Sequence, residues 1–276
     1  MTTSTPTAPG LPATLSIRDR PRPPTAWTAC RVLCWRAARH LRHGAVEQLF
    51  DIAMMPVIFL LIFNYLFGGA IAGAPSDYLR YFLPGVLVMA AVMQTTSTGT
   101  TISTDVARGV FDRFRSLPFW PPAALVGTVL VDLGRYLLAL LLTAGLGLLM
   151  GFRPAAGAAG LLAALLLILA VAFAFAWIFT AVGLLSTRPE SLQSASMVLM
   201  VVVFCSNIFV NSRTMPGWLR TIVDLNPISH ASTAARGLTD GTVTAGQVGL
   251  VLVTAAGIVA VFGPLTMYLY RRKSRG

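Results

Sequence analysis

Long runs of apolar residues without a charge recur along the chain, separated by short polar stretches. A helix that crosses a bilayer needs about 20 mainly apolar residues. The runs predict an all-α membrane protein with six transmembrane helices, of which the fourth is tilted or broken because of its glycines and surplus length. The expected spans are Ile52–Ala72, Tyr81–Thr104, Tyr136–Phe152 with its backward extension Ala123–Val131, Ala155–Thr187, Ser191–Ser212 and one within Thr242–Tyr270.

The composition also requires a bilayer as solvent. Of the 276 residues, 55% are hydrophobic and only 11% are charged, whereas a soluble domain carries about a quarter charged residues. In such a chain the net charge of +11 reports orientation rather than nucleic-acid binding. Residues 1–25 are rich in Thr, Pro and Arg, have no apolar signal-peptide core and read as a disordered cytosolic tail.

The basic residues choose the orientation. With both termini in the cytosol, fifteen Arg and Lys residues lie inside and five lie outside, and Arg135 lies within a span. Because cytoplasmic loops are enriched in basic residues, we expect a multi-pass protein of the cell membrane with both termini cytoplasmic. The twenty arginines against one lysine indicate a GC-rich bacterial genome. Residues 47–270 then form one transmembrane domain, and residues 271–276 form a basic cytosolic tail.

Two further segments look interfacial. Within 26–46, Trp27, Cys30, Cys34 and Leu41 recur at helical spacing with arginines on another face, which predicts an amphipathic helix lying flat on the inner membrane surface. Simple positive-inside anchoring explains the arginines equally well. Residues 212–241 are too polar to span and contain two breaks, at Pro216-Gly217 and Asn226-Pro227, so we expect short helices at the outer face.

The stretch DVARGVFDRFRSLPFWPP interrupts the apolar pattern after the second span. On a helix, its charged side chains fall on one face and its aromatic ones on the opposite face, and prolines stop it. We expect a short amphipathic cytosolic helix over 105–118 that transmits force. The alternative is a passive connector. The residues concerned are Asp105, Arg108, Gly109, Phe111, Asp112, Phe114, Arg115, Leu117 and Pro118.

Catalytic chemistry is hard to place in this chain. Its one lysine, Lys273, follows Arg272, so no G-x-x-x-x-G-K-[ST] phosphate loop is present. We therefore expect a protein that is not itself an enzyme.

Asp132 and Arg135 stand three apart on the third span and can pair. Such a pair is either a neutralised structural contact or part of an ion relay.

The second span carries an unusual density of hydroxyl groups. Gln94, Ser97, Thr98 and Thr101 share one face of the expected helix. In a bilayer, such groups either bond neighbouring helices or line a polar pathway for a substrate. These four residues are the candidate substrate path, and packing between helices is the alternative.

Several motifs together resemble those of ABC-2 type permeases, of the daunorubicin-resistance drug-exporter kind. The resemblance rests on Asp105, Arg108-Gly109, Asp112-Arg113 and Leu117-Pro118, and on Asn226-Pro227 before the last span. The family usually has Glu where this chain has Asp105. The resemblance implies an exporter subunit for amphipathic drugs or lipids, coupled through 105–118 to a separate ATPase that binds ATP and Mg²⁺, with no cofactor in this chain. It also implies a second permease chain, identical or related.

Three other functions remain open at this stage. An ABC-2 permease could instead export a glycan or a lipid-linked polymer. An ion-coupled secondary transporter would place more ionisable groups near the midplane of the membrane. A membrane scaffold or immunity protein would need no transport path at all.

Overall fold

The computed structural model describes residues 45–69, 73, 75–107, 122–186 and 189–273, and within these ranges it contains helices and no strand. In chain order the elements are α2 (Ala45–Ile62), the π-helical turn η1 (Phe63–Phe67), α4 (Pro75–Ala107), α6 (Pro122–Leu149), α7 (Gly157–Leu185), α8 (Pro189–Phe204), the 3-10 turn η2 (Ser212–Thr214), α9 (Gly217–Leu225), α10 (Pro227–Asp240) and α11 (Ala245–Lys273).

The helices agree with the expected all-α membrane fold. Four of them, α4, α6, α7 and α11, are long and apolar enough to cross a bilayer, and two shorter apolar helices cover Met54–Phe67 and Ser191–Phe204. α7 runs without a break from Gly157 to Leu185, so the fourth expected span is not broken.

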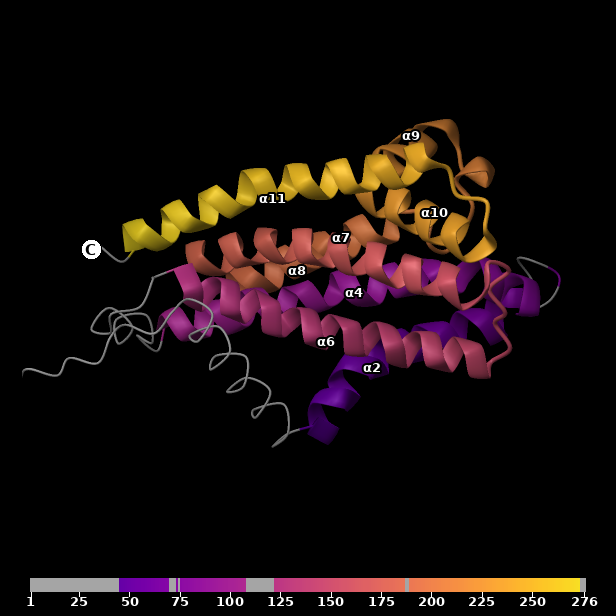
Figure 1. Ribbon diagram of the computed structural model, residues 1–276, viewed down its shortest axis with the longest axis horizontal. Coiled ribbons are helices and arrows are strands. Elements are labelled where there is room, and N and C mark those ends of the chain that lie inside the picture. The colour runs from indigo at the N-terminus through magenta and orange to yellow at the C-terminus, as the bar shows by residue number, and fades with distance from the viewer. Residues whose placement is uncertain (1–44, 70–72, 74, 108–121, 187–188, 274–276) are drawn as a thin grey trace, which may run out of the picture.

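α4 lies at the centre of the bundle. It packs against α7, α6, α10, α2 and α8, and 78% of its most apolar window is buried, compared with 11% for α11. Figure 1 shows α11 along one side of the bundle, with α9 and α10 at the end opposite the C-terminus. Helices at the periphery of a membrane protein face lipid or a partner, whereas a central helix can carry polar groups.

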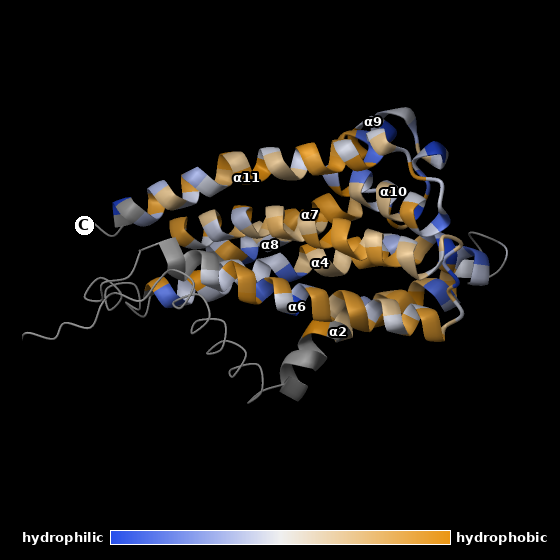
Figure 2. Cartoon of the chain, in the orientation of Figure 1, coloured by the Kyte–Doolittle hydropathy of each residue, from blue (hydrophilic) through white to orange (hydrophobic). Residues whose placement is uncertain are grey.

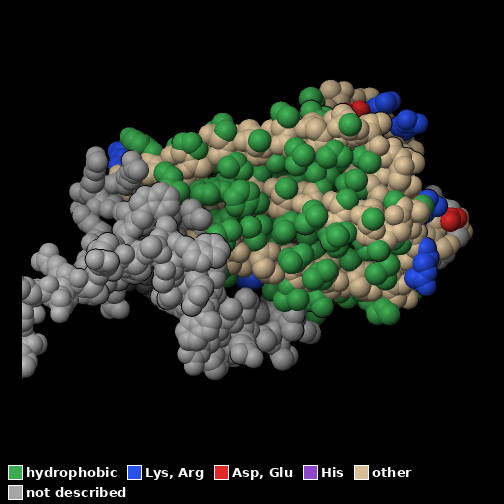
Figure 3. Space-filling model, in the orientation of Figure 1, with side chains coloured by type: hydrophobic (Ala, Val, Ile, Leu, Met, Phe, Trp, Pro, Cys, Tyr) green, Lys and Arg blue, Asp and Glu red, His purple; other side chains and the backbone are tan. Residues whose placement is uncertain are grey.

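Hydrophobic side chains cover the flank of the bundle in Figure 3, and the arginines and acidic residues visible there lie mainly toward its ends. The main core is formed by the first half of α4 together with α6, α7 and α10. Its largest fully buried side chains include Tyr78, Phe82, Leu83 and Tyr136. Apolar flanks and charged ends are what a protein solvated by a bilayer requires.

The fifth expected span differs from the prediction. The apolar run Ser191–Ser212 does not form one helix, because α8 ends at Phe204 and the chain from Cys205 to Asn211 is not helical. The N–H of Cys205 still donates to the carbonyl of Val201 over 2.8 Å, but the residues that follow do not continue the helix. Side chains of α4 and α10 instead donate to the carbonyls of Asn207, Ile208 and Phe209.

Several expectations fall outside the described residues. These are the tail 1–25, nearly all of the amphipathic helix 26–46, and Arg108 to Pro118 of the expected coupling helix. Asp105, the first residue of that helix, is described, and α4 continues through it to Ala107. α9 and α10 lie within the segment 212–241, for which short helices were expected.

Candidate functional site

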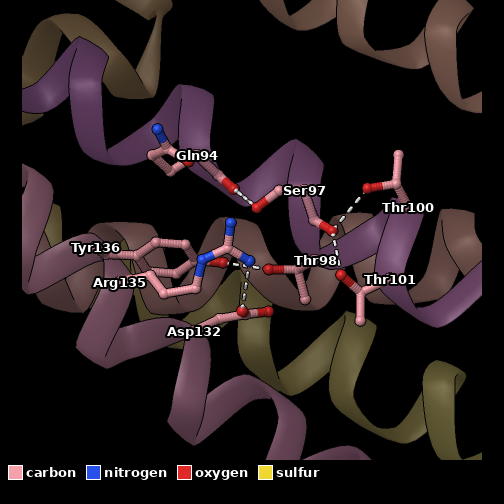
Figure 4. A network of polar contacts seen from close by, with 8 residues as sticks. All are labelled: Gln94, Ser97, Thr98, Thr100, Thr101, Asp132, Arg135 and Tyr136. Atoms are coloured by element: carbon pink, nitrogen blue, oxygen red, sulfur yellow. Dashed lines mark hydrogen bonds and ion pairs between the residues drawn. The ribbon is translucent and has the colours of Figure 1, made fainter. Parts of the chain in front are cut away.

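The four candidate path residues on α4 have different surroundings (Figure 4). Thr98 is fully buried and shares a short hydrogen bond with the hydroxyl of Tyr136 on α6. The amide nitrogen of Gln94 donates to the carbonyl of Ile52 on α2 over 3.2 Å. Thr101 is exposed and donates to the carbonyl of Ser97 over 2.9 Å. Thr98 and Gln94 therefore join helices, whereas Thr101 faces outward.

Outward-facing hydroxyl groups continue along the second half of α4. Thr100 and Thr104 are exposed, and each donates to a backbone carbonyl three or four residues earlier, at 2.8 Å in both cases. The donors are therefore satisfied, but the oxygen atoms still make this face more polar than a surface built for lipid. α8 also packs against α4, and its first turns expose Ser191, Gln193 and Ser194.

We call these six exposed residues of α4 and α8 the hydroxyl surface. Figure 2 shows that the second half of α4 and the beginning of α8 are more hydrophilic than most of the bundle. Exposed polar groups along the length of an apolar bundle suit a water-filled path or a contact with another polar surface. The hydroxyl surface consists of Thr100, Thr101, Thr104, Ser191, Gln193 and Ser194.

Asp132 and Arg135 form an ion pair on α6, as their spacing predicts. The Arg135 Nη1 atom lies 3.4 Å from Oδ1 of Asp132, and the Asp132 side chain is only 5% exposed. The other carboxylate oxygen of Asp132 and Nε of Arg135 are buried and have no hydrogen-bond partner among the described residues. Thr98 and Tyr136 lie beside the pair in Figure 4. The pair thus neutralises two charges inside the bundle.

A second polar cluster, not found by sequence reasoning, lies at the end of the bundle where α10 meets α4. The Arg236 guanidinium donates to the carbonyl oxygens of Tyr81 (2.8 Å), Asn207 (2.8 Å) and Ile208 (3.1 Å). It also lies 3.8 Å from the centre of the Tyr81 ring. Burial lowers the pKa of Arg236, and Tyr81, Tyr78 and Asp240 act in the opposite direction. Arginine nevertheless stays protonated.

Other side chains complete the support of the non-helical segment after α8. Tyr81 donates its hydroxyl to the carbonyl of Asn207 over 2.8 Å, and Tyr78 donates to the carbonyl of Phe209 over 3.1 Å. The Asn207 side chain bonds Thr233 over 2.8 Å and also accepts from Ser232. We call this cluster the Arg236 knot. It consists of Tyr78, Tyr81, Asn207, Ser229, Ser232, Thr233 and Arg236.

Asn226, the first residue of the Asn-Pro motif, connects two helix ends. Its side-chain oxygen accepts from the backbone N–H of Ile228 over 2.9 Å and so caps α10. Its side-chain nitrogen donates to the carbonyls of Val202 (2.7 Å) and Cys205 (2.9 Å), at the end of α8. One amide therefore satisfies groups that two helix termini would otherwise leave unpaired.

An aromatic cluster lies between η1, α4 and the segment after α8. Phe63 and Phe209 have ring centres 5.0 Å apart, and Phe204 stacks on Phe209 at the same distance. Phe59 and Phe82 extend the cluster, with ring centres 5.6 and 5.7 Å from Phe63. Phe204 is 44% exposed. The cluster therefore reaches the surface as a set of aromatic faces and edges.

The sequence contained a signal for the Arg236 knot. Ser229, Ser232, Thr233 and Arg236 recur at intervals of three, one and three residues, which places them on one face of α10. Their partners in residues 205–210 could not be identified from spacing. Among the described residues, no three His, Cys, Asp or Glu side chains gather as a metal site would require.

Comparison with known proteins agrees with this architecture. The ABC-2 type transporter family matches residues 28–239, so the chain belongs to that family. It is 50% identical over 272 residues, covering 98% of this chain and 96% of the other, to the daunorubicin resistance ABC transporter permease protein DrrB1 of Streptomyces coeruleorubidus. It is 26% identical over 223 residues, 80% of each chain, to the probable doxorubicin resistance ABC transporter permease protein DrrC of Mycobacterium tuberculosis.

Proposed function

We propose that the chain is the transmembrane permease subunit of an ATP-driven exporter that moves hydrophobic or amphipathic drugs out of the cell. The observation that carries the proposal is the 50% identity to a permease named for daunorubicin resistance, over nearly the whole of both chains. A separate ATPase subunit supplies the energy and binds ATP and Mg²⁺. Export of a glycan or lipid-linked polymer is the alternative, because the family match alone does not choose a substrate.

The proposed topology has six crossings of a bacterial cell membrane and cytoplasmic termini. Four crossings are α4, α6, α7 and α11, and α2 with η1 and α8 with its non-helical continuation supply the other two. Single cysteines in a Cys-free background test this topology. A membrane-impermeant reagent applied from outside should label the exposed positions Ser76 and Thr242 and should not label Ser116. Labelling of position 116 from outside would contradict the topology.

The proposed substrate path follows the hydroxyl surface at the cytosolic half and the aromatic cluster farther out. Gln94, Ser97 and Thr98 are the other candidate path residues on α4. Thr98 anchors α4 to α6. A second permease chain, identical or related, closes the path, because exposed hydroxyl groups on a membrane helix otherwise face lipid. Hydroxyl groups and aromatic rings together suit an amphipathic aromatic drug better than a sugar polymer.

Removing the hydroxyl groups tests the path. The triple replacement Thr100→Val, Thr101→Val and Thr104→Val keeps the shape of each side chain and leaves α4 without these polar atoms. The chain, co-expressed with its ATPase and reconstituted in vesicles, should export doxorubicin at least tenfold more slowly. Thr254→Val is the matched control, because Thr254 on α11 is partly exposed and also donates to a carbonyl four residues earlier, at 2.7 Å.

Two results would distinguish transport from assembly. If the triple variant assembles with the ATPase but transports less, the hydroxyl groups line the path. Should it transport normally, or lose assembly to the same extent as transport, the path lies elsewhere. If the complex exports a glycan instead, the unmodified complex should not move doxorubicin out of the vesicle.

Coupling to the ATPase is proposed for 105–118. α4 carries Asp105 near one end and Tyr78 and Tyr81 near the other, and a 33-residue helix is about 50 Å long. A push at Asp105 is therefore transmitted along one continuous helix to the Arg236 knot.

Charge reversal tests this coupling. Arg108→Glu with Arg115→Glu should reduce co-purification of the ATPase or separate ATP hydrolysis from transport, while the chain still enters the membrane. Arg272→Glu, in the terminal basic cluster, is the control. Phe111→Ala or Phe114→Ala should uncouple transport without releasing the ATPase. If the variant with both arginines reversed binds the ATPase and transports normally, the segment 105–118 is only a connector.

A further inference from the structure

α9 presents three different faces, although it has only nine residues. Val223 is buried at 1% exposure and points toward the protein. Arg220 and Asp224 are exposed and lie 3.4 Å apart as an ion pair. Trp218, Ile222 and Leu225 are 70%, 50% and 76% exposed. We call these last three residues the α9 stripe.

The three faces follow from the helical repeat. Successive residues of an α-helix are rotated by about 100°, so positions 218, 222 and 225 share one sector. Positions 220 and 224 share a second sector, and position 223 lies in the third. Each sector therefore meets a different surrounding, and the α9 stripe is neither in the core nor on the charged side.

We propose that the α9 stripe is seated in the interfacial region of the lipid bilayer, so that α9 lies where protein, lipid and water meet. Trp is enriched at this depth because its ring is apolar and its indole N–H needs a polar partner. Ile222 and Leu225 then contact the upper acyl chains. Arg220 and Asp224, rotated away from the stripe, stay in water.

The position of α9 in the molecule supports a lipid partner. α9 lies at the end of the bundle that also carries α10 and the start of α11 (Figure 1). At that end, α11 exposes Leu250, Leu252 and Val253, and a span that is 11% buried has most of its surface available to lipid. Arginine side chains lie at the same end in Figure 3. The stripe thus stands at the boundary between the apolar flank and the charged end.

A second protein chain fits this stripe less well than a bilayer. A stable protein interface buries about 800 Å² on each partner, whereas even a large aromatic side chain buries only about 150–250 Å². Three side chains on a nine-residue helix do not reach that area, and the adjacent sector carries an exposed ion pair. Lipid contact has no minimum area, because each apolar side chain gains separately from leaving water.

The lipid contact has a consequence for α10. α9 ends at Leu225, the residue directly before Asn226, and it packs mainly against α10 and η2. A bilayer that holds Leu225 therefore also restrains the asparagine that caps α10 and supports the end of α8. The position of this cap relative to the membrane surface is then set by lipid as well as by protein.

Fluorescence quenching of Trp218 tests the proposal in the full chain with its ATPase. Trp27, Trp35, Trp120 and Trp177 are replaced by Phe, which leaves Trp218 as the single tryptophan. In vesicles, lipids brominated near the glycerol end of the acyl chain should quench at least half of its emission. Lipids brominated near the chain terminus and aqueous iodide should each quench much less.

Each other result of this experiment would overturn the proposal. Strong quenching by iodide alone would place Trp218 in water, for example over a substrate exit. Resistance to every quencher would mean that another protein surface covers the stripe. Stronger quenching by the deeply brominated lipid would mean that α9 inserts into the hydrocarbon core rather than lying at the interface.

Spin labels provide a second measurement that keeps all tryptophans. In a background without the native cysteines, Ile222→Cys and Asp224→Cys carry a nitroxide on the stripe and on the charged sector, respectively. Collisions with oxygen, which concentrates in lipid, should dominate at position 222, and collisions with a water-soluble nickel chelate should dominate at position 224. Equal accessibility at the two positions would overturn the proposal.

Discussion

Gly99 of α4 and Gly183 of α7 form a crossing point at which the two backbones touch. A Cβ atom placed on Gly183 would lie 2.5 Å from the carbonyl oxygen of Gly99, and one on Gly99 would lie 2.9 Å from the carbonyl oxygen of Phe179. Backbone atoms cannot rotate away as a flexible side chain can. Small residues at such crossings allow membrane helices to pack closely, so this pair sets the distance between the two best-packed helices of the bundle.

Gly183→Ala should therefore destabilise the protein by about 1–3 kcal/mol, the usual cost of overpacking. The matched control is Gly249→Ala on α11, where an added Cβ meets no atom within 4 Å. Thermal unfolding in detergent, followed by the loss of monodisperse protein, measures both. An unchanged midpoint for Gly183→Ala would show that α4 and α7 can separate at no cost.

Arg236→Lys should destabilise the Arg236 knot although it keeps the charge. A single ammonium group cannot serve the carbonyls of Tyr81, Asn207 and Ile208 as the planar guanidinium does, and a buried group left unpaired costs about 1–3 kcal/mol. Arg80→Gln is the control. It removes an exposed ion pair with Asp240, 2.9 Å long and 56% exposed at the arginine, which is worth about 0–1 kcal/mol.

The two replacements are compared by the temperature at which limited proteolysis first cuts the chain after α8. Arg236→Lys should lower this temperature clearly more than Arg80→Gln does. Equal shifts would mean that the knot contributes no more than a surface contact.

Asn226→Ala should be more damaging than loss of an ordinary helix cap. Replacing an N-cap by Ala costs about 0.5–2 kcal/mol, and here two carbonyls at the end of α8 lose their donor as well. Asn211→Ala is the control, because Asn211 caps only the exposed turn η2. Asn226→Ser keeps the acceptor for Ile228 but not the two donors, so its stability should fall between those of Asn226→Ala and the unmodified chain.

The pair Asp132–Arg135 should behave as a neutralised unit. Asp132→Asn or Arg135→Gln alone leaves one buried charge uncompensated and should cost about 3 kcal/mol, while the double variant should recover most of the loss. Melting of all four proteins completes the double-mutant cycle. A proton or ion relay would instead leave stability unchanged and abolish transport in each single variant.

The long helices and their polar interruptions could be predicted because both are local properties. Runs without charge predicted most of α4, α7 and α11, whereas α6 had to be extended backward past Asp132 and Arg135. The end of α8 could not be predicted in this way, since Cys205, Ser206 and Asn207 differ little in polarity from residues inside other spans. Cys205 and Asn207 have hydrogen-bond partners more than 20 residues further along the chain, and no local pattern identifies such a distant partner.

The candidate path shows the same limit at finer scale. Thr98 and Thr101 are three residues apart and chemically identical, yet one bonds Tyr136 and the other is exposed. Helical spacing groups them on one side of α4 but gives no information on where α6 crosses it. From the sequence, Arg236 is only one of the five basic residues expected outside the membrane, because the buried carbonyls that surround it come from segments that are not adjacent in the sequence.

The support of α8 by Asn226 also constrains the order of events during synthesis. A 16-residue helix is about 24 Å long, which is less than the roughly 30 Å hydrocarbon thickness of a bilayer. The carbonyl of Val202 accepts a hydrogen bond from Asn226, which is synthesised 24 residues later. When α8 leaves the ribosome, it is thus too short to span and its last carbonyls are unpaired. The end of α8 is therefore completed only after Asn226 and α10 have been synthesised, which makes α8 and α10 one late unit of folding.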